Sequence, residues 1–281
     1  MPFSLRCGSR LLHYEYPAVM GILNATVDSF YDGGRYLDDS AIVSRAVQIV
    51  DEGADIVDIG VVSTRPGAVM LSPDEEARRL QYVVGLVRRE LPQAVISVDT
   101  CYSLPVRAAV DAGADIVNDI SEGAFDATLF QTVADLHTPY ILTHNPYGTP
   151  PDPSGTASDH TFDFNAFVTH ISSLIAKLHL LGVADVIVDP GFGFSKSLQD
   201  NYTLFGHLGE LRQLFPTNPL LVAISRKSMI YKLLKTTSTE ALVGTTALHA
   251  AALMAGAQML RVHDVSAARQ AIMIISKVVS D

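Results

Sequence analysis

Two adjacent cations, Arg226 and Lys227, follow an apolar run in the stretch LLVAISRKSMI (220–230) of a chain whose formal net charge is −10. Seven other short apolar runs also end in polar or charged side chains. In chain order these ends carry Asn24, Asp58, Asp99, Asn118, His144, Asp189, Ser225 with Arg226 and Lys227, and Arg261 with His263. One such residue is typical of a helix cap or a turn. Eight in succession predict a shared ligand site.

These residues are of two chemical kinds. Asp99, Asn118 and Asp189 offer short hydrogen-bonding groups that suit a planar N–H edge, such as that of a guanidine-like heterocycle. Arg261 and His263 alternate along the last run, so we expect both to face one side of a strand and to bind an anion. Asn24 offers an oxygen for a phosphate group or a metal. Together, these two kinds of residue predict a ligand that is an aminoheterocycle carrying a phosphate ester.

Two glycine-containing loops follow the first two apolar runs. They read ATVDSFYDGGRY (25–36) and GVVSTRPGAVML (60–71), and the second contains Arg65. Either loop alone is typical of a solvated surface turn. Because both follow runs that end in the polar residues, we expect them to close over the site as lids.

A repeated phrase indicates the elements that position these residues. GADIVD (53–58), GADIVN (113–118), GVADVIVD (182–189) and GAQMLRVHD (256–264) each follow a stretch of helical period. A glycine that ends a helix therefore precedes a buried strand. Further strands are expected at 18–24, 94–100, 139–144 and 220–225.

Eight strand–helix units predict an α/β fold, the (β/α)₈ TIM barrel, whose strands all point their carboxyl ends at one mouth. An open doubly wound sheet is the alternative, but no glycine-rich dinucleotide motif follows the first strand. The segment LRCGSRLLHYEY (5–16) predicts a short N-terminal β-hairpin that closes the barrel floor. We expect one domain over residues 1–281.

Composition excludes several classes of protein. The acidic balance disfavours nucleic acid and membrane surfaces as partners. No apolar run is long enough to span a bilayer, and the first ten residues lack the core of a signal peptide. The two cysteines, Cys7 and Cys101, favour free thiols in a reducing cytoplasm. No His, Cys and Asp spacing suggests a zinc site.

Several motifs, taken in order from about residue 17 to the C-terminus, resemble the dihydropteroate synthase family. They are MGILNATVDSFYDGG, GADIVDIG with STRPGA, SVDT, GADIVNDIS, DPGFGFSKS, SRKS and GTTALHAAALMAGAQMLRVHDV. The resemblance implies a barrel enzyme that joins 7,8-dihydropterin-6-ylmethyl diphosphate to p-aminobenzoate, releasing diphosphate and 7,8-dihydropteroate. This family belongs to folate biosynthesis, is the target of sulfonamides and is usually dimeric, so a homodimer is expected here.

The resemblance also implies roles for single residues. The pterin would contact Asp99, Asn118, Asp189 and Lys227. The diphosphate would contact Asn24, Thr64, Arg65, Arg261 and His263, with Mg²⁺ near Asn24. The p-aminobenzoate site would include Thr64, Pro66, Phe194 and Ser228, and catalytic roles would fall to Asp28, Arg65 and Lys227.

The chain departs from the family's motifs at a few positions. Val27 replaces a proline, Val61-Val62 replaces Gly-Glu, THN (143–145) replaces Met-His-Met, and Ser195 replaces a glycine. No charged residue assigned above is lost. We expect a less apolar pterin pocket there, in which Thr143 or Asn145 contributes a hydrogen bond.

Three other functions remain possible from the sequence. Pterin-binding methyltransferases share the barrel but do not need STRPG, SRKS and RVHD together. A Schiff-base lyase would use Lys227 as its nucleophile. A non-catalytic pterin-binding protein would bind the diphosphate without turnover.

Overall fold

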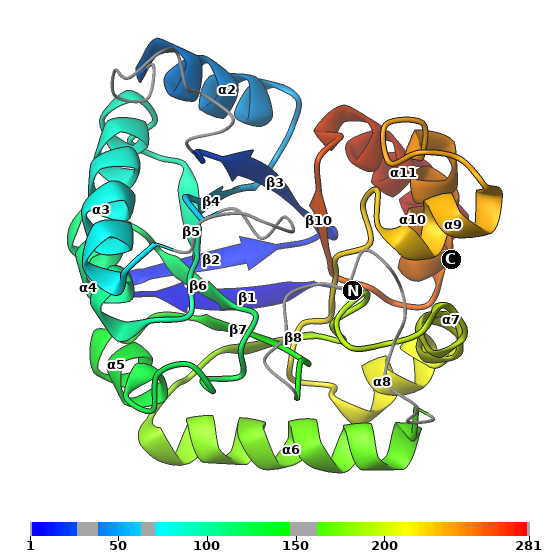
Figure 1. The fold of residues 1–281 in the computed structure, drawn as a ribbon. Coiled ribbons are helices and arrows are strands. Elements are labelled where there is room, and N and C mark those ends of the chain that lie inside the picture. Colours follow the sequence, from blue (N-terminus) through cyan, green and yellow to red (C-terminus); the bar gives the residue numbers. More distant parts are fainter. Residues whose placement is uncertain (1, 27–38, 63–70, 147–161, 280–281) are drawn as a thin grey trace.

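The computed structural model describes residues 2–26, 39–62, 71–146 and 162–279 (Figure 1). In this part of the chain, eight parallel strands form one ring. They are β3 (Ala18–Asn24), β4 (Ile56–Gly60), β5 (Val95–Asp99), β6 (Ile116–Asp119), β7 (Tyr140–Thr143), β8 (Val186–Asp189), β9 (Leu221–Val222) and β10 (Met259–Val262). Each strand overlaps one of the runs that the sequence predicts, and β4 and β6 extend beyond theirs to Gly60 and Asp119.

The sheet closes on itself. The strand order is β8-β7-β6-β5-β4-β3-β10-β9, and a parallel bridge between Val188 of β8 and Leu220, next to β9, joins its two ends. The predicted TIM barrel is therefore confirmed, and the open doubly wound sheet is excluded because that sheet would keep two free edges.

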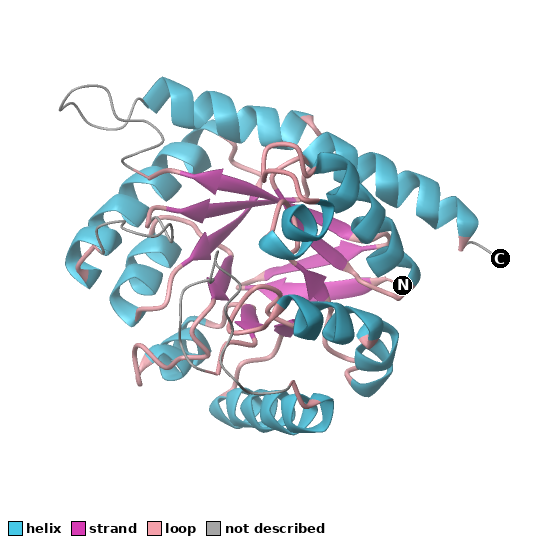
Figure 2. Cartoon of the chain, turned by 45° about the vertical axis from the view of Figure 1, so that its right-hand side comes forward, coloured by secondary structure: helices cyan, strands magenta, loops and turns pink. Residues whose placement is uncertain are grey.

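Helices surround the ring of strands, as Figure 2 shows. The described helices are α2 (Asp39–Asp51), α3 (Pro73–Glu90), α4 (Ser103–Asp111), α5 (Leu129–Leu136), α6 (Phe164–Leu181), α7 (Leu198–Gly206), α8 (Leu208–Leu214), α9 (Ser228–Leu234), α10 (Leu242–Met254) and α11 (Val265–Val278). None of them is long and apolar enough to cross a membrane. The glycines of the repeated phrase, Gly53, Gly113, Gly182 and Gly256, have φ between +97° and +109°, as expected for residues that end a helix.

The barrel interior is apolar near the strand starts. Every strand of the ring contributes a buried side chain to this layer, for example Ile56, Ile116 and Ile187. Strands β1 (Phe3–Cys7) and β2 (Arg10–Tyr14) pair as the predicted N-terminal hairpin. Phe3 and Leu5 of β1 join the same apolar cluster, so the hairpin closes the floor of the barrel.

The next inward positions are mostly polar, with Ile22 and Ala223 as the apolar exceptions. Because side chains alternate along a strand, the residues two places after the apolar layer point to the same side. These positions carry Asp58, Ser97, Asn118, Thr143, Asp189 and Arg261. The apolar layer thus forms the base on which a polar layer lies nearer the strand ends.

Candidate active site

Arg261 joins two carboxylates across the barrel. Its Nε donates to Oδ2 of Asp58 at 2.6 Å, and its Nη2 donates to Oδ2 of Asp99 at 2.6 Å. Asn118 also donates to Asp58 Oδ2, at 3.3 Å. Strands β4, β5, β6 and β10 are therefore tied together through one polar cluster in the mouth.

The charges in this cluster are strongly perturbed. Burial raises the pKa of Asp99 to about 6; Arg261 opposes this shift and Asp58 adds to it. Burial disfavours the cation of Arg261, but the two carboxylates outweigh that effect and raise its pKa. Oδ1 of the fully buried Asp58 has no hydrogen-bond partner among the described residues. A buried acceptor without a partner is rare in folded proteins and marks this cluster as a candidate binding site.

Asp189 and Lys227 form the opposite side of the mouth. Asp189 accepts from the backbone N–H of Gly191 at 2.8 Å and from Thr143 Oγ1 at 3.5 Å. Burial raises the pKa of Asp189, while Lys227 opposes the shift. Lys227 donates from Nζ to the carbonyl of Phe192 at 2.6 Å. Burial lowers the pKa of Lys227 to about 8, opposed by Asp189.

The glycine-rich loop after β8 is held close to these groups. Gly191 has φ +71°, and a Cβ there would lie 2.0 Å from the carbonyl oxygen of His144. The ring of Phe194 lies 4.9 Å from Lys227 Nζ, an arrangement that favours the lysine's charge over an aromatic face. Ser195 has φ +50°, which explains why glycine is usual at this position in the family.

Asn201 of α7 fixes this loop from behind. Its Oδ1 accepts from Gly193 N–H at 2.7 Å, and its Nδ2 donates to the carbonyls of Lys196 and Ser197 at 3.1 and 2.7 Å. The sequence analysis did not single out Asn201, because a lone Asn inside a helical stretch gives no signal by itself.

The two adjacent cations have different surroundings. Arg226 donates from Nε and Nη2 to both oxygens of Asp264, each at 2.8 Å, and from Nη1 to two carbonyls of the loop before α10. Lys227 instead contacts the glycine-rich loop. The interpretation that Arg226 organises an acidic neighbour agrees with these contacts.

His263 lies just after β10, and Ser228 lies at the start of α9. His263 is exposed, follows β10 directly, and its Nδ1 lies 3.1 Å from Oγ of Ser225. Ser228 is the first residue of α9 and is partly exposed. Both side chains are accessible to a ligand.

Asn24 ends β3 and is exposed, with no side-chain hydrogen bond to the described residues. A Cβ built at Gly60 would lie 3.9 Å from Asn24 Oδ1 and 3.7 Å from Asp99 Cβ, so Asn24 borders the polar cluster. Among the described residues no group of three His, Cys, Asp or Glu side chains could hold a metal. A lone amide oxygen fits Mg²⁺, because Mg²⁺ commonly takes one or two protein ligands and completes its shell with phosphates and water.

Several predicted residues do not join this cluster. The expectation that all eight strand ends meet at the mouth is wrong for His144. Its ring is 7% exposed and packs 4.5 Å from Phe167 of α6, on the helix side of the sheet. Asn145 donates its side-chain amide to the Ile120 carbonyl. Asp28, Thr64, Arg65 and Pro66, with most of both predicted lid loops, lie outside the described residues.

Comparison with known proteins defines the class. A family model described as pterin binding enzyme matches residues 20–263, most of the chain. The barrel and its carboxylate-lined mouth thus belong to a pterin-binding enzyme.

Individual relatives narrow this class. The chain is 36% identical to a dihydropteroate synthase of Streptococcus pyogenes over 264 residues, 92% of this chain and 95% of that one. It is 36% identical to that of Escherichia coli over 271 residues, 96% of this chain and 94% of that one. The chain belongs to the dihydropteroate synthase family, whose members are transferases.

Solved structures of dihydropteroate synthases share the fold of this chain. A dihydropteroate synthase of Xanthomonas albilineans with 4-aminobenzoic acid superposes with a TM-score of 0.88 at 35% identity, covering 100% of both chains. A Yersinia pestis dihydropteroate synthase in complex with a sulfonamide drug gives 0.87 at 33% identity, covering 99% of this chain and 100% of that one.

Proposed function

We propose that this chain condenses 7,8-dihydropterin-6-ylmethyl diphosphate with p-aminobenzoate to give 7,8-dihydropteroate and diphosphate. The observation that carries the proposal is the juxtaposition of Asp99, Asn118, Asp189 and Lys227 at one mouth, in a chain of the dihydropteroate synthase family. The first three offer acceptors and an amide to a planar heterocycle edge, which is the recognition that a pterin needs.

The pterin would lie between the two sides of the mouth. Asp189 presents a buried carboxylate whose Oδ1 accepts the Gly191 N–H, whereas Oδ2 has only a 3.5 Å bond from Thr143 and can also accept from the amino-pyrimidine edge. Oδ1 of Asp58, which has no partner, offers a further acceptor to that heterocycle. Lys227 would donate to a carbonyl or ring nitrogen of the pterin, in place of its bond to Phe192.

The diphosphate would lie over the end of β10. Arg261 contributes a half-buried cation, and His263 and Asn24 contribute exposed polar groups beside it. We propose that Arg65 and Thr64 add to this anion site. Neutralisation of the leaving group's charge favours breakage of its bond to the methylene carbon.

Mg²⁺ would be held by Asn24 together with oxygens of the substrate, and when bound it would stabilise negative charge on the departing diphosphate. Every other contribution comes from the chain. The electron-rich pterin stabilises positive charge at its methylene carbon, so the protein's task is to hold the ring and exclude water. We propose that Asp28 stabilises that cationic state.

The p-aminobenzoate would bind beside the Phe194 ring, with Ser228 at the start of α9 and with Thr64 and Pro66. An arylamine is nucleophilic without a strong base, so its attack needs no general base from the protein. The proximity of Phe194 to Lys227 Nζ, 4.9 Å, places this second site next to the pterin site.

We also propose that the chain works as a homodimer in the cytoplasm. Helices α10 and α11 lie side by side on the outside of the barrel (Figure 1). Both expose large apolar side chains: Val243, Met254, Met273, Ile274 and Val278 are each more than half exposed. Exposed apolar side chains on two adjacent helices favour burial against a second copy. Both cysteines are free and buried, as in proteins of reducing compartments.

The direct test is an assay of purified protein with pterin diphosphate, p-aminobenzoate and Mg²⁺. We expect 7,8-dihydropteroate to form, diphosphate release to depend on p-aminobenzoate, and a sulfonamide to compete with it. Lys227→Ala should abolish turnover while the circular dichroism spectrum stays unchanged. Absence of product from the wild-type protein would defeat the proposal, and an unchanged rate in Lys227→Ala would remove Lys227 from the site.

A further inference from the structure

A cavity of about 340 Å³ lies at the barrel end opposite the active site. It is bordered by the turn of the N-terminal hairpin, the end of α3, and the loops that lead into β6 and β7. Its lining residues are Cys7, Gly8, Ser9, Arg10, Arg88, Pro92, Val110, Gly113, Ala114, Asp115, Leu136 and Thr138. None of them belongs to the proposed active site, so the cavity needs its own explanation.

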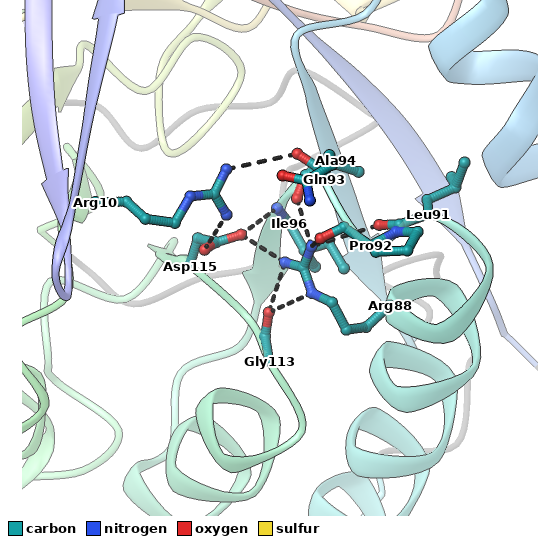
Figure 3. A network of polar contacts seen from close by, with 9 residues as sticks. All are labelled: Arg10, Arg88, Leu91, Pro92, Gln93, Ala94, Ile96, Gly113 and Asp115. Carbon is teal, nitrogen blue, oxygen red and sulfur yellow. Dashed lines mark hydrogen bonds and ion pairs between the residues drawn. The ribbon is translucent and has the colours of Figure 1, made fainter.

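All the N–H donors of one of the two arginines in the cavity wall are hydrogen-bonded within the protein. Arg88 donates from Nη2 to Asp115 at 2.7 Å, and Nε and Nη2 both bond the Gly113 carbonyl (Figure 3). Its Nη1 donates to the carbonyls of Leu91, Pro92 and Ala94. Asp115 additionally accepts from the backbone N–H of Ile96. Arg88 and Asp115 therefore hold the loops before β5 and β6 together, and Arg88 has no donor left for a ligand.

The second arginine, Arg10, has only weak hydrogen bonds within the protein. Arg10 makes two hydrogen bonds at the long end of the range, 3.4 Å to Asp115 Oδ1 and 3.5 Å to the carbonyl of Gln93 (Figure 3). Its side chain is 40% exposed. Since a guanidinium has five N–H donors in a fixed fork, most of the donor capacity of Arg10 remains for an anion.

A buried hydroxyl in the same cavity has no partner. Thr138 is 6% exposed and its Oγ1 makes no hydrogen bond among the described residues. Buried polar groups are nearly always hydrogen-bonded, so a ligand atom that reached Oγ1 of Thr138 would supply its missing partner. Cys7 adds no negative charge beside it, because burial raises the pKa of its thiol to about 12.

The charge and the remaining wall define the chemistry of the occupant. Arg10 and Arg88 against Asp115 leave one net positive charge, which matches a monoanion, whereas a dianion would be repelled by Asp115. Val110 and Leu136 supply an apolar wall. The space of about 340 Å³ is far larger than one water molecule needs, so it admits a small organic molecule.

We propose that this cavity binds a small aliphatic monocarboxylate, with the carboxylate on Arg10 and Thr138 and the chain against Val110 and Leu136. The site is independent of the pterin chemistry, since the apolar layer of the barrel and the hairpin separate it from the mouth.

The test uses 4,4,4-trifluorobutyrate as the probe and ligand-observed ¹⁹F NMR on the full chain. We expect line broadening that saturates with probe concentration in the wild-type protein. Arg10→Gln and Thr138→Val should each weaken binding by about tenfold, because each removes a hydrogen bond to the carboxylate. Thr138→Val fills the same volume and removes a hydroxyl that has no partner, so it should fold as well as the wild type.

Two controls keep the outcome clear. Lys227→Ala, altered at the mouth, should bind the probe as the wild type does, and uncharged 4,4,4-trifluorobutanol should bind much more weakly than the carboxylate. The proposal is overturned if the wild-type protein does not broaden the probe signal. It is equally overturned if Arg10→Gln and Thr138→Val bind as the wild type does, or if Lys227→Ala abolishes binding.

Discussion

Nη2 of Arg261 lies 2.6 Å from Oδ2 of Asp99, so a residue proposed to bind diphosphate is ion-paired with one proposed to bind the pterin. The Nε of the same guanidinium bonds Asp58, and Asp58 in turn accepts from Asn118. Only the planar fork of arginine reaches two carboxylates in this way. If these two roles hold, recognition of the two halves of the substrate is coupled through Arg261.

Arg261→Lys tests this coupling. Lysine keeps the charge but loses the fork, so one buried carboxylate is left without its partner. We expect the KM for pterin diphosphate to rise by about tenfold or more and the free energy of unfolding to fall by about 1–3 kcal/mol. Arg78→Lys, the same change at an exposed pair with Glu75, should alter neither quantity. Equal effects of the two substitutions would show that Arg261 has no special role.

The pH dependence of pterin binding follows from two opposed shifts. Asp99, with its pKa raised to about 6, is ionised only above that pH. Lys227, with its pKa lowered to about 8, is charged only below that pH. We expect tightest binding of 6-hydroxymethyl-7,8-dihydropterin, which carries no diphosphate to titrate, between these values, with a loss on both sides.

Calorimetric titration across this range measures the profile. Asp99→Asn should remove the acidic limb, because the amide does not titrate. An acidic limb that persists in Asp99→Asn would assign it to another group.

Gly191→Ala tests the shape of the loop after β8. The added Cβ would lie 2.0 Å from the carbonyl of His144, and the backbone has φ +71°. We expect loss of about 3 kcal/mol or more of stability, together with loss of pterin binding, because the loop carries the carbonyl that holds Lys227. Gly85→Ala, inside α3 where a Cβ would meet nothing within 4 Å, should instead stabilise the protein by about 0.5–1 kcal/mol. Urea unfolding distinguishes the two, and a stable, active Gly191→Ala would contradict the packing described.

Asn201 is a positioning residue for the same loop. Asn201→Ala removes its three hydrogen bonds, which should lower stability by about 2–4 kcal/mol. A merely structural role would leave the pH profile unchanged. We expect instead that the alkaline limb moves, because the Phe192 carbonyl no longer holds Lys227 at a fixed place. Asn201→Asp, which keeps the acceptor for Gly193 N–H, should show a smaller change.

The sequence predicts the barrel well because each strand is a short β-branched run after a helix-ending glycine, a local signal that tertiary contacts do not override. It also predicts that Asp99, Asn118 and Asp189 share one mouth, since parallel strands align their carboxyl ends. It cannot show which way a side chain turns at a strand end, and His144 accordingly packs on α6. The ion pairs of Arg261 with Asp58 and Asp99 depend on closure of the barrel, because the partners are separated by 203 and 162 positions in the sequence.

Acid stability depends on a buried histidine of α10. His249 is 2% exposed, its Nε2 has no hydrogen-bond partner among the described residues, and burial lowers its pKa to about 4. The folded protein therefore keeps His249 neutral where the unfolded chain, with a pKa of about 6.5, is protonated. The stability that this difference contributes is fully present above about pH 6.5 and is lost as the pH falls towards about 4.

His249→Leu should reduce the loss of unfolding free energy between about pH 7.5 and about pH 5 by about 2 kcal/mol, measured by urea unfolding. The exposed His13, changed to Gln, serves as the control and should leave this pH dependence as it is in the wild type. A pH dependence that survives in His249→Leu would assign the acid sensitivity to other buried groups.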